Sequence, residues 1–144
     1  MNCDFREFVQ SLNAHKVRYL VVGGYAVAFH GHPRYTKDID IWIEGTPENA
    51  QQILCALDEF GFGSLDINPD DFLVLGQVIQ LGYPPRRIDL LTSLSGVNFT
   101  DCFDSRIVAK MEEASVNFIN LENLRKNKQA SGRSQDLADL DNLP

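Results

Sequence analysis

The sequence predicts a fold of the α+β (α/β) class, in which a small mixed β-sheet is flanked by helices and followed by a C-terminal helical tail. Short apolar runs rich in β-branched residues, at 19–22 and 39–43, have the length and the two-residue period of strands. Apolar residues three and four positions apart, at 4–15 and 47–60, indicate amphipathic helices. The stretch 121–142 has the composition of a helical tail.

The first helix and the first strand are each predicted by a simple pattern. Phe5, Phe8 and Leu12 lie on one stripe of a helix over residues 4–15. The run Tyr19–Val22 is apolar and β-branched enough to form a strand, and it stops where two glycines follow. We therefore expect a helix, a strand and a tight connection in that order.

The glycine pair Gly23 and Gly24 separates this strand from the helix-forming residues 25–30. Because glycine has no Cβ, a ligand can approach the main chain there, and the free N–H groups at the start of the helix would point at it. This geometry is typical of an anion-binding site. An ordinary tight turn is the alternative interpretation of the glycines taken alone.

The segment Asp38–Ile43 alternates acidic and apolar residues with the period of a strand. Asp38 and Asp40 then project from one face, and the isoleucines project from the other face into a core. Two carboxylates so close together repel each other unless a cation lies between them. Mg²⁺ and Mn²⁺ prefer such oxygen ligands, so the pair predicts a divalent metal site. A solvated strand face is the alternative.

A helix, several short strands and two loops are expected after this segment. Thr46 as N-cap and Pro47 in the first turn begin a helix that stops at Gly61. Asp89 belongs to a later strand that can lie beside the Asp38–Ile43 strand. The local patterns predict another helix start or a turn at 68–72, strands at 77–81 and 86–91, a loop at 93–98, a helical turn at 99–105, and strands at 107–110 and 116–119.

The tail 121–142 is interrupted at Gly132, which suits the position after a helix end, and Ser134 suits the N-cap of a last short helix. Lys128 and Arg133 flank the interruption. Both side chains can reach inward to a triphosphate, the arginine with a planar fork and the lysine as a point charge. The alternative is that they only offset the dipole of the helix.

Composition places the 144 residues in one compact domain, 1–144, with a core at 17–119 and a helical segment at 120–144. The chain has no apolar run of membrane-spanning length and no signal peptide, so we expect a cytoplasmic protein that does not contact a membrane. A net charge of −7 argues against broad binding to DNA. The three cysteines predict neither a disulfide framework nor a zinc site.

Two motifs together resemble a known group of enzymes. The order Gly23-Gly24, a short helix, Thr36-x-Asp38-Ile39-Asp40 and then Asp89 resembles the active-site signature of the nucleotidyltransferase superfamily of the DNA polymerase beta type. Its small, minimal members and the toxins of abortive-infection and toxin–antitoxin loci are the most similar. In the tail, Asn-Lys-x-Ala-x-Gly-Arg-x-x-Asp-x-x-Asp, starting at Asn127, looks like the C-terminal motif of many bacterial minimal members, where the lysine and the arginine–aspartate pair close one wall of the active cleft.

The resemblance implies a nucleotidyltransferase fold and a role for each matching residue. Where many members have Gly-Ser, this chain has Gly-Gly-Tyr, so phosphate contacts would come from the backbone or from Thr36. Salt bridging is the alternative role for Asp89, and ordinary surface positions are the alternative for Arg34 and Thr36. The implied catalytic and metal-binding residues are Asp38, Asp40 and Asp89, and the implied nucleotide- and phosphate-binding residues are Gly23, Gly24, Arg34, Thr36, Lys128 and Arg133.

The expected activity is the Mg²⁺-dependent transfer of a nucleoside monophosphate from a triphosphate such as ATP to an acceptor hydroxyl, with release of pyrophosphate. Relatives modify small molecules, RNA ends or protein side chains, and a toxin–antitoxin role would add a cognate partner protein. One alternative is a catalytically weak member of the fold that acts as a nucleotide-binding or antitoxin-like partner module. The other is a metal- or nucleotide-sensing protein, which would release no pyrophosphate.

Overall fold

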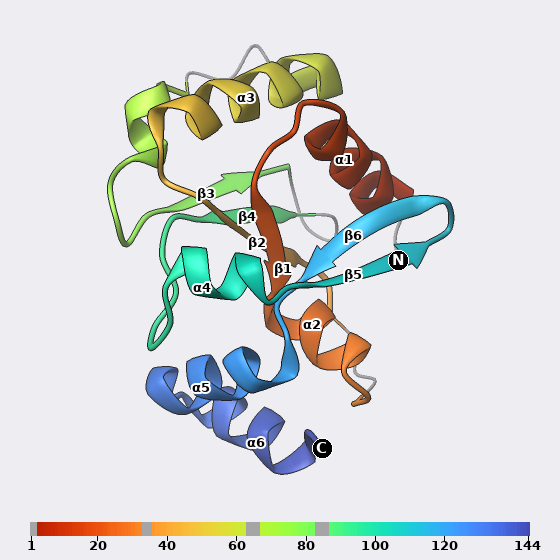
Figure 1. Ribbon diagram of the computed structural model, residues 1–144, viewed down its shortest axis with the longest axis vertical. Helices are drawn as coiled ribbons and strands as arrows, with labels where there is room; N and C mark the ends of the chain where they lie inside the picture. The colour runs from red at the N-terminus through yellow and green to blue at the C-terminus, as the bar shows by residue number, and fades with distance from the viewer. Residues whose placement is uncertain (1–2, 33–35, 63–66, 83–86) are drawn as a thin grey trace.

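A computed structural model describes residues 3–32, 36–62, 67–82 and 87–144, which form a six-stranded mixed sheet with helices packed around it (Figure 1). Helices α1 and α3 contact each other at one end of the molecule, and α5 and α6 contact each other at the opposite end. This arrangement confirms the predicted α+β class and the helical tail. The helices are α1 (Cys3–Ala14), α2 (Gly23–Phe29), α3 (Pro47–Leu57), α4 (Phe99–Asp104), α5 (Leu121–Ser131) and α6 (Ser134–Asn142).

The strand order of the sheet is β3-β4-β2-β1-β6-β5. The central strand β2 runs antiparallel to β1 and parallel to β4, while β1 and β6 are parallel. The outer pairs β3–β4 and β5–β6 are antiparallel. The strands are β1 (Tyr19–Val22), β2 (Ile39–Ile43), β3 (Val78–Leu81), β4 (Ile88–Leu91), β5 (Ile107–Met111) and β6 (Ala114–Phe118).

Side-chain caps explain where several helices begin. The Thr46 hydroxyl accepts a hydrogen bond from the backbone N–H of Asn49, and Pro47 occupies the first turn of α3, as predicted. After α3, a π-helical turn (Asp58–Phe62) reaches the predicted stop, and Gly61 there has a positive φ. A 3₁₀ turn (Pro69–Phe72) follows with a complete capping box.

Two local predictions need correction. Helix α2 begins at Gly23 itself, so both glycines belong to its first turn instead of preceding it. Ser134 is not the N-cap of the last helix; Arg133 holds that position, and its side chain does not cap the helix. Arg133 instead reaches Asp136, one turn into α6. Gly132 takes the predicted left-handed conformation after α5.

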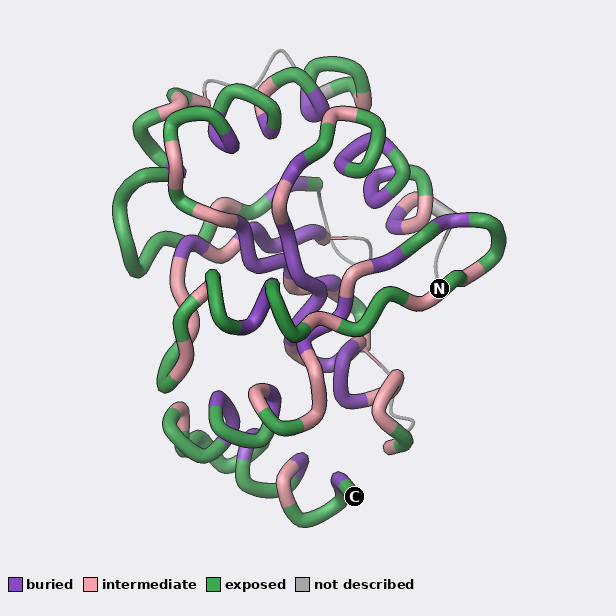
Figure 2. Tube along the Cα trace, in the orientation of Figure 1, coloured by how far each residue is buried: buried purple, intermediate pink, exposed green. Residues whose placement is uncertain are grey.

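The core lies between the sheet and the apolar faces of its helices, where Figure 2 shows the buried segments gathered in the central strands and the inner sides of α1 and α3. Ile39, Ile41 and Ile43 are fully buried, which confirms the predicted inner face of β2. Trp42, on the opposite face, is also buried and meets Phe99 of α4 edge to face. Both faces of β2 are therefore covered.

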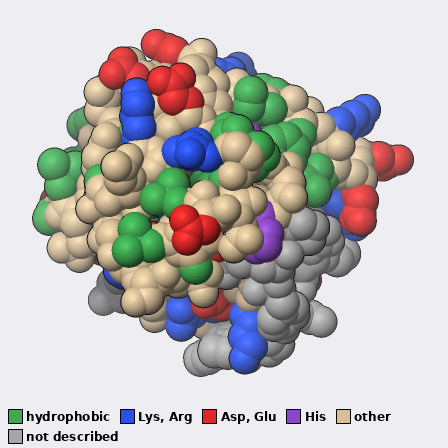
Figure 3. All heavy atoms as spheres, turned by 90° about the horizontal axis from the view of Figure 1, so that it is seen from below, with side chains coloured by type: hydrophobic (Ala, Val, Ile, Leu, Met, Phe, Trp, Pro, Cys, Tyr) green, Lys and Arg blue, Asp and Glu red, His purple; other side chains and the backbone are tan. Residues whose placement is uncertain are grey.

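The described helices include none that is long and apolar enough to cross a membrane. Cys55 and Cys102 are free thiols, the first exposed and the second buried. Figure 3 views the end of the molecule formed by α2, α5 and α6, where Lys and Arg side chains lie scattered among neutral and hydrophobic ones. The described part of this face carries no continuous basic surface of the kind that non-specific nucleic-acid binding requires.

Candidate active site

Neighbouring strands bring the acidic residues of the two predicted strands together. In the parallel pair β2–β4, Asp40 lies directly opposite Asp89. The two carboxyl groups share a hydrogen bond, and Asp89 is buried. Asp38 lies one residue before β2 begins. The predicted acidic triad is thus assembled at one place in the sheet.

Arg87 lies among these carboxylates. Its Nη2 is 2.8 Å from Asp38 Oδ2, and its Nε is 3.0 Å from Asp89 Oδ1. Nη2 also donates to Asp89 Oδ2 at 3.4 Å, so the guanidinium binds Asp89 through two nitrogens while it holds Asp38. The salt bridge considered for Asp89 on sequence grounds is therefore present, and it extends to Asp38.

The carboxyl group of Asp40 is electrostatically strained. Burial raises its pKa from the ordinary value of 3.8 to about 6, and the negative charges of Asp89 and Asp38 add to the shift. Lys128 and Arg133 oppose it from across the cavity. Burial also raises the pKa of Asp89, although Arg87 counteracts that effect. Perturbed carboxyl groups of this kind are typical of functional sites.

Gly23 makes room for Asp40. Its φ is +65°, and a Cβ at this position would lie 2.2 Å from Asp40 Oδ2. The space left by the missing Cβ of Gly23 is therefore occupied by the Asp40 carboxylate, whereas a bound ligand was expected there from the sequence. Val22, which precedes helix α2, is extended and supplies no side-chain cap. The first N–H groups of α2 therefore have no side-chain cap, and both glycines line the adjoining cavity.

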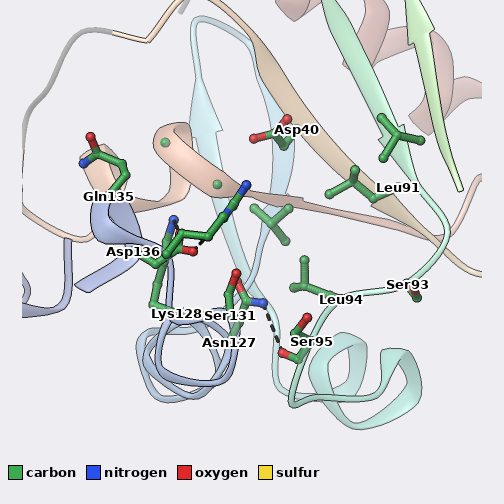
Figure 4. Close-up of a pocket in the computed structure, with 15 residues that line it drawn as sticks. Asp40, Leu91, Ser93, Leu94, Ser95, Asn127, Lys128, Ser131, Gln135 and Asp136 are labelled. Carbon is green, nitrogen blue, oxygen red and sulfur yellow. Dashed lines mark hydrogen bonds and ion pairs between the residues drawn. The ribbon is translucent and has the colours of Figure 1, made fainter. Parts of the chain in front are cut away.

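A cavity of about 540 Å³ lies between this edge of the sheet and the C-terminal helices (Figure 4). It unites five of the predicted residues, Gly23, Gly24, Asp40, Lys128 and Arg133. Asn127 and Asp136, which belong to the C-terminal motif, also line it. Its wall is completed by residues that the motifs did not indicate, namely Val22, Val78, Leu91, Ser93, Leu94, Ser95, Ser131 and Gln135.

Lys128 is held inside a network of carboxylates. Its buried Nζ is 3.1 Å from Asp136 Oδ1 and 3.1 Å from Asp139 Oδ2. Arg133 Nε is 2.9 Å from Asp136 Oδ2, but 79% of the arginine side chain is exposed. Burial alone would raise the pKa of Asp136, yet hydrogen bonds from Arg133, Ser131 and Lys128 lower it to about 2. Arg133 is thus the more accessible cation, and Lys128 the better anchored one.

The other predicted residues lie beside the cavity or outside the described chain. Thr36 Oγ1 donates to the backbone oxygen of Asp38 at 3.0 Å, so its hydroxyl supports the turn into β2. Thr36, Asp38 and Asp89 are not part of the cavity wall. Arg34 lies outside the described residues. Its predicted phosphate contact, like that of Thr36, stays a prediction.

Sequence reasoning missed the wall formed by the 92–98 loop. Gly96 has a φ of +78°, and a Cβ there would lie 2.5 Å from Ala130 Cβ and 3.2 Å from the Lys126 carbonyl oxygen. Asn127 Nδ2 also donates to the carbonyl oxygen of Ser95 at 3.1 Å. The loop is therefore held tightly against α5. The available signal was the position of Asn127 at the start of the C-terminal motif.

The donor types of the triad fit a divalent ion, but their present arrangement is not a preformed metal cage. Carboxylate oxygens are what Mg²⁺ and Mn²⁺ prefer, and burial together with the charges of Asp89 and Asp38 raises the pKa of Asp40, so a nearby cation would favour its charged form. Among the described residues, however, no group of three or more His, Cys, Asp or Glu side chains is positioned to hold a metal. Arg87 must release Asp38 and Asp89 before all three carboxylates can bind one ion.

Comparisons with known proteins agree with this fold. The model of a family described as "Nucleotidyltransferase of unknown function (DUF6036)" matches residues 4–143. A crystal structure from Thermotoga maritima, described as a "putative nucleotidyltransferase", superposes with a TM-score of 0.65 at 17% sequence identity. The match covers 96% of this chain and 88% of that one. A search of curated proteins finds no match.

Proposed function

Because the chain belongs to this family of nucleotidyltransferases of unknown function, we propose that it transfers a nucleoside monophosphate from a nucleoside triphosphate to an acceptor hydroxyl. The observation that carries the proposal is the cavity, which places Asp40 opposite two cationic side chains, Lys128 and Arg133. Carboxylates on one side and cations on the other suit a phosphate chain held together with a divalent ion.

The cationic wall would bind the triphosphate. The exposed guanidinium of Arg133 is anchored through Nε by Asp136, which leaves its other nitrogens for phosphate oxygens. Lys128 would contribute mainly its charge, because two carboxylates already hold its ammonium group. The backbone N–H groups of Gly23 and Gly24 would bind further phosphate oxygens.

The carboxylates would carry out proton transfer and hold the metal. We assign the proton of the acceptor hydroxyl to the hydrogen-bonded Asp40–Asp89 pair, in which the sequence indicated Asp89 as the base. The acceptor oxygen then bonds to the α-phosphorus, the bond between the α-phosphorus and its bridging oxygen breaks, and pyrophosphate leaves. Asp38, Asp40 and Asp89 would hold Mg²⁺ or Mn²⁺, which when bound neutralises phosphate charge.

The proposal includes the molecule that accepts the nucleotide and the biological role of the transfer. A small molecule, an RNA end or a protein side chain would supply the hydroxyl, and a toxin–antitoxin or abortive-infection role would add a cognate partner protein. The net charge of −7 and the scattered basic side chains support a local site for one anionic substrate over broad binding to DNA.

The test is calorimetric titration of ATP, GTP, CTP and UTP with Mg²⁺, followed by a transfer assay with α-labelled nucleotide. One nucleotide is expected to bind the wild type in a metal-dependent way and to yield labelled product and pyrophosphate. Asp40→Asn should abolish transfer, whereas the matched control Asp104→Asn, an exposed position on α4, should not. Absence of metal-dependent binding by the folded wild type would contradict the proposal.

A second candidate function is favoured by Arg87. Its ion pairs occupy two of the three carboxylates, an arrangement suited to a nucleotide-binding partner module that does not transfer the nucleotide. Such a module would bind a triphosphate through Arg133 but release no pyrophosphate. Pyrophosphate release by the wild type and by Arg87→Met distinguishes the two functions. An enzyme releases pyrophosphate as the wild type, whereas a module releases none in either form, even after the substitution has freed its carboxylates.

A further inference from the structure

Asn127 presents an uncommitted polar atom to the cavity. The residue is buried, with a relative exposure of 7%, and it lines the cavity beside Lys128. Its Nδ2 donates to the Ser95 carbonyl oxygen at 3.1 Å, which fixes the orientation of the carboxamide because only the nitrogen can donate. No described residue donates to its Oδ1.

An amide oxygen that is accessible and has no donor within the protein can accept a hydrogen bond from a bound molecule. Asn127 Oδ1 fits this description: no described donor reaches it, and it is not among the fully buried atoms without a partner, which in the described residues are Trp42 Nε1 and Arg106 Nε. The Oδ1 atom of Asn127 is thus a fixed acceptor available to a bound molecule.

Both charged and apolar side chains line the cavity near Asn127. Figure 4 shows Asn127 and Ser95 on the side of the cavity away from Asp40, with Lys128 and Ser131 beside Asn127 and Leu94 near Ser95. Leu91 and Leu94 add apolar surface to the same cavity. Apolar surface together with an accessible acceptor suits an uncharged group with a flat face and a hydrogen-bond donor, which a nucleoside has and a phosphate lacks.

We propose that Asn127 is a specificity-determining residue that accepts a hydrogen bond from the nucleoside of the bound triphosphate. The inference rests on the proposed function, because the same cavity must hold the nucleotide. The donor is a ribose hydroxyl or an N–H group of the base, and these share the chemistry that a carboxamide oxygen recognises. Leu94 and Leu91 lie against the same nucleoside.

The experiment compares Asn127→Leu with wild type by calorimetry, using the preferred nucleotide and inorganic tripolyphosphate, each with Mg²⁺. The variant should bind the nucleotide about five- to tenfold more weakly, the contribution of one hydrogen bond, and bind tripolyphosphate unchanged. The matched control is Asn123→Leu, which removes a carboxamide from the same helix that donates to Ser105 outside the cavity. This control should bind both ligands like the wild type.

Nucleotide analogues identify the donor and exclude a purely structural effect. We compare 2′-deoxy and 3′-deoxy nucleotides with one whose base lacks its N–H donor. One analogue should bind the wild type more weakly than the parent nucleotide does. In Asn127→Leu the same analogue and the parent nucleotide should bind equally well, because the hydrogen bond is already absent there. A structural role of the Asn127–Ser95 contact would instead weaken every analogue by the same factor in the variant, and this result would overturn the inference.

The remaining outcomes are equally decisive. If Asn127→Leu does not fold, the analogue series in the wild type decides, and equal affinity for every analogue overturns the inference. If the wild type binds a nucleotide and Asn127→Leu binds it equally well, the inference fails while the proposed function stands. If the wild type binds neither a nucleotide nor tripolyphosphate, the proposed function fails and the inference falls with it.

Discussion

Gly23 and Asp40 depend on each other through one short contact. The glycine has a positive φ and also leaves the space that the Asp40 carboxylate occupies. In return, the carboxylate lies half-buried beside the start of α2, and burial raises its pKa to about 6. Each residue type is therefore required by the other, and both belong to the cavity.

Replacement of Gly23 by alanine should lower the unfolding free energy by more than the cost of placing alanine at a positive φ. A positive φ costs an L-residue roughly 1–2 kcal/mol, and overpacking against Asp40 adds roughly 1–3 kcal/mol. Gly76→Ala is the matched control, because Gly76 has a φ of +81° with nothing within 4 Å of the added Cβ. Urea unfolding measures both. In an Asp40→Ala background most of the difference should disappear, because only the contact with the Cβ of residue 40, at 3.1 Å, remains. An undiminished difference would contradict the contact.

The raised pKa of Asp40 predicts a pH-dependent stability. Because the folded state binds a proton at this site up to about pH 6, the contribution of Asp40 is most favourable below its ordinary pKa of 3.8 and is lost as pH rises through 6. At about pH 8, Asp40→Asn should be more stable than wild type by roughly 2–3 kcal/mol. At about pH 4 the advantage should vanish. Urea unfolding with a chelator present measures both values, and an advantage independent of pH would refute the assignment.

The loop between β4 and α4 packs against α5 more closely than a side chain would permit. Gly96 approaches Ala130 and the Lys126 carbonyl oxygen, and the hydrogen bond from Asn127 to Ser95 joins the same two elements. This contact keeps one wall of the cavity, from Ser93 to Ser95, next to the helix that carries Lys128. The width of the cavity is therefore set by the packing of a loop on a helix.

Gly96→Ala should widen the cavity and weaken nucleotide binding. The new methyl group would lie 2.5 Å from Ala130 Cβ, so the loop must move away from α5 and lose the Asn127–Ser95 hydrogen bond. We expect a loss of roughly 1–3 kcal/mol in unfolding free energy and at least severalfold weaker nucleotide binding. Ala130→Gly alone should cost about 1 kcal/mol in helix propensity. Combined, the two changes should recover much of the affinity measured by calorimetry, and strict additivity would contradict this account.

In the whole molecule, the cavity joins segments from both ends of the chain. Gly23 and Asp40 come from the first third, while Lys128 comes from α5 and Arg133 from the junction between α5 and α6. These helices contact each other at one end of the molecule (Figure 1). A ligand bound in the cavity would therefore connect α5 and α6 to the sheet.

Nucleotide with Mg²⁺ should slow amide hydrogen exchange in α5 and α6 as well as in α2. A ligand at one hundred times its dissociation constant stabilises the bound state by about 2.7 kcal/mol, and local opening that breaks the site loses this stabilisation. The exchange of α1, which lies at the opposite end, should change only through global unfolding. Protection confined to α2 would show that the C-terminal helices do not take part in binding.

The sequence predicted most elements because their signals are local. The alternation in Asp38–Ile43, the cap at Thr46 and the break at Gly132 depend on neighbouring residues only, and the structure contains each of them. Long-range partners were harder to predict. The bridging role of Arg87 and the close approach of Gly96 to α5 depend on segments that meet only in the folded chain.

Arg87 supplies the acidic triad with a positive charge encoded in the chain itself. If only a bound metal ion offset the repulsion between these carboxylates, the chain would be less stable without the ion, and a chelator would unfold it. Here the guanidinium already joins Asp38 to Asp89 across adjacent strands. The sheet can therefore form without a bound ion, and under the proposed function removal of metal should stop nucleotide transfer while leaving the unfolding free energy nearly unchanged.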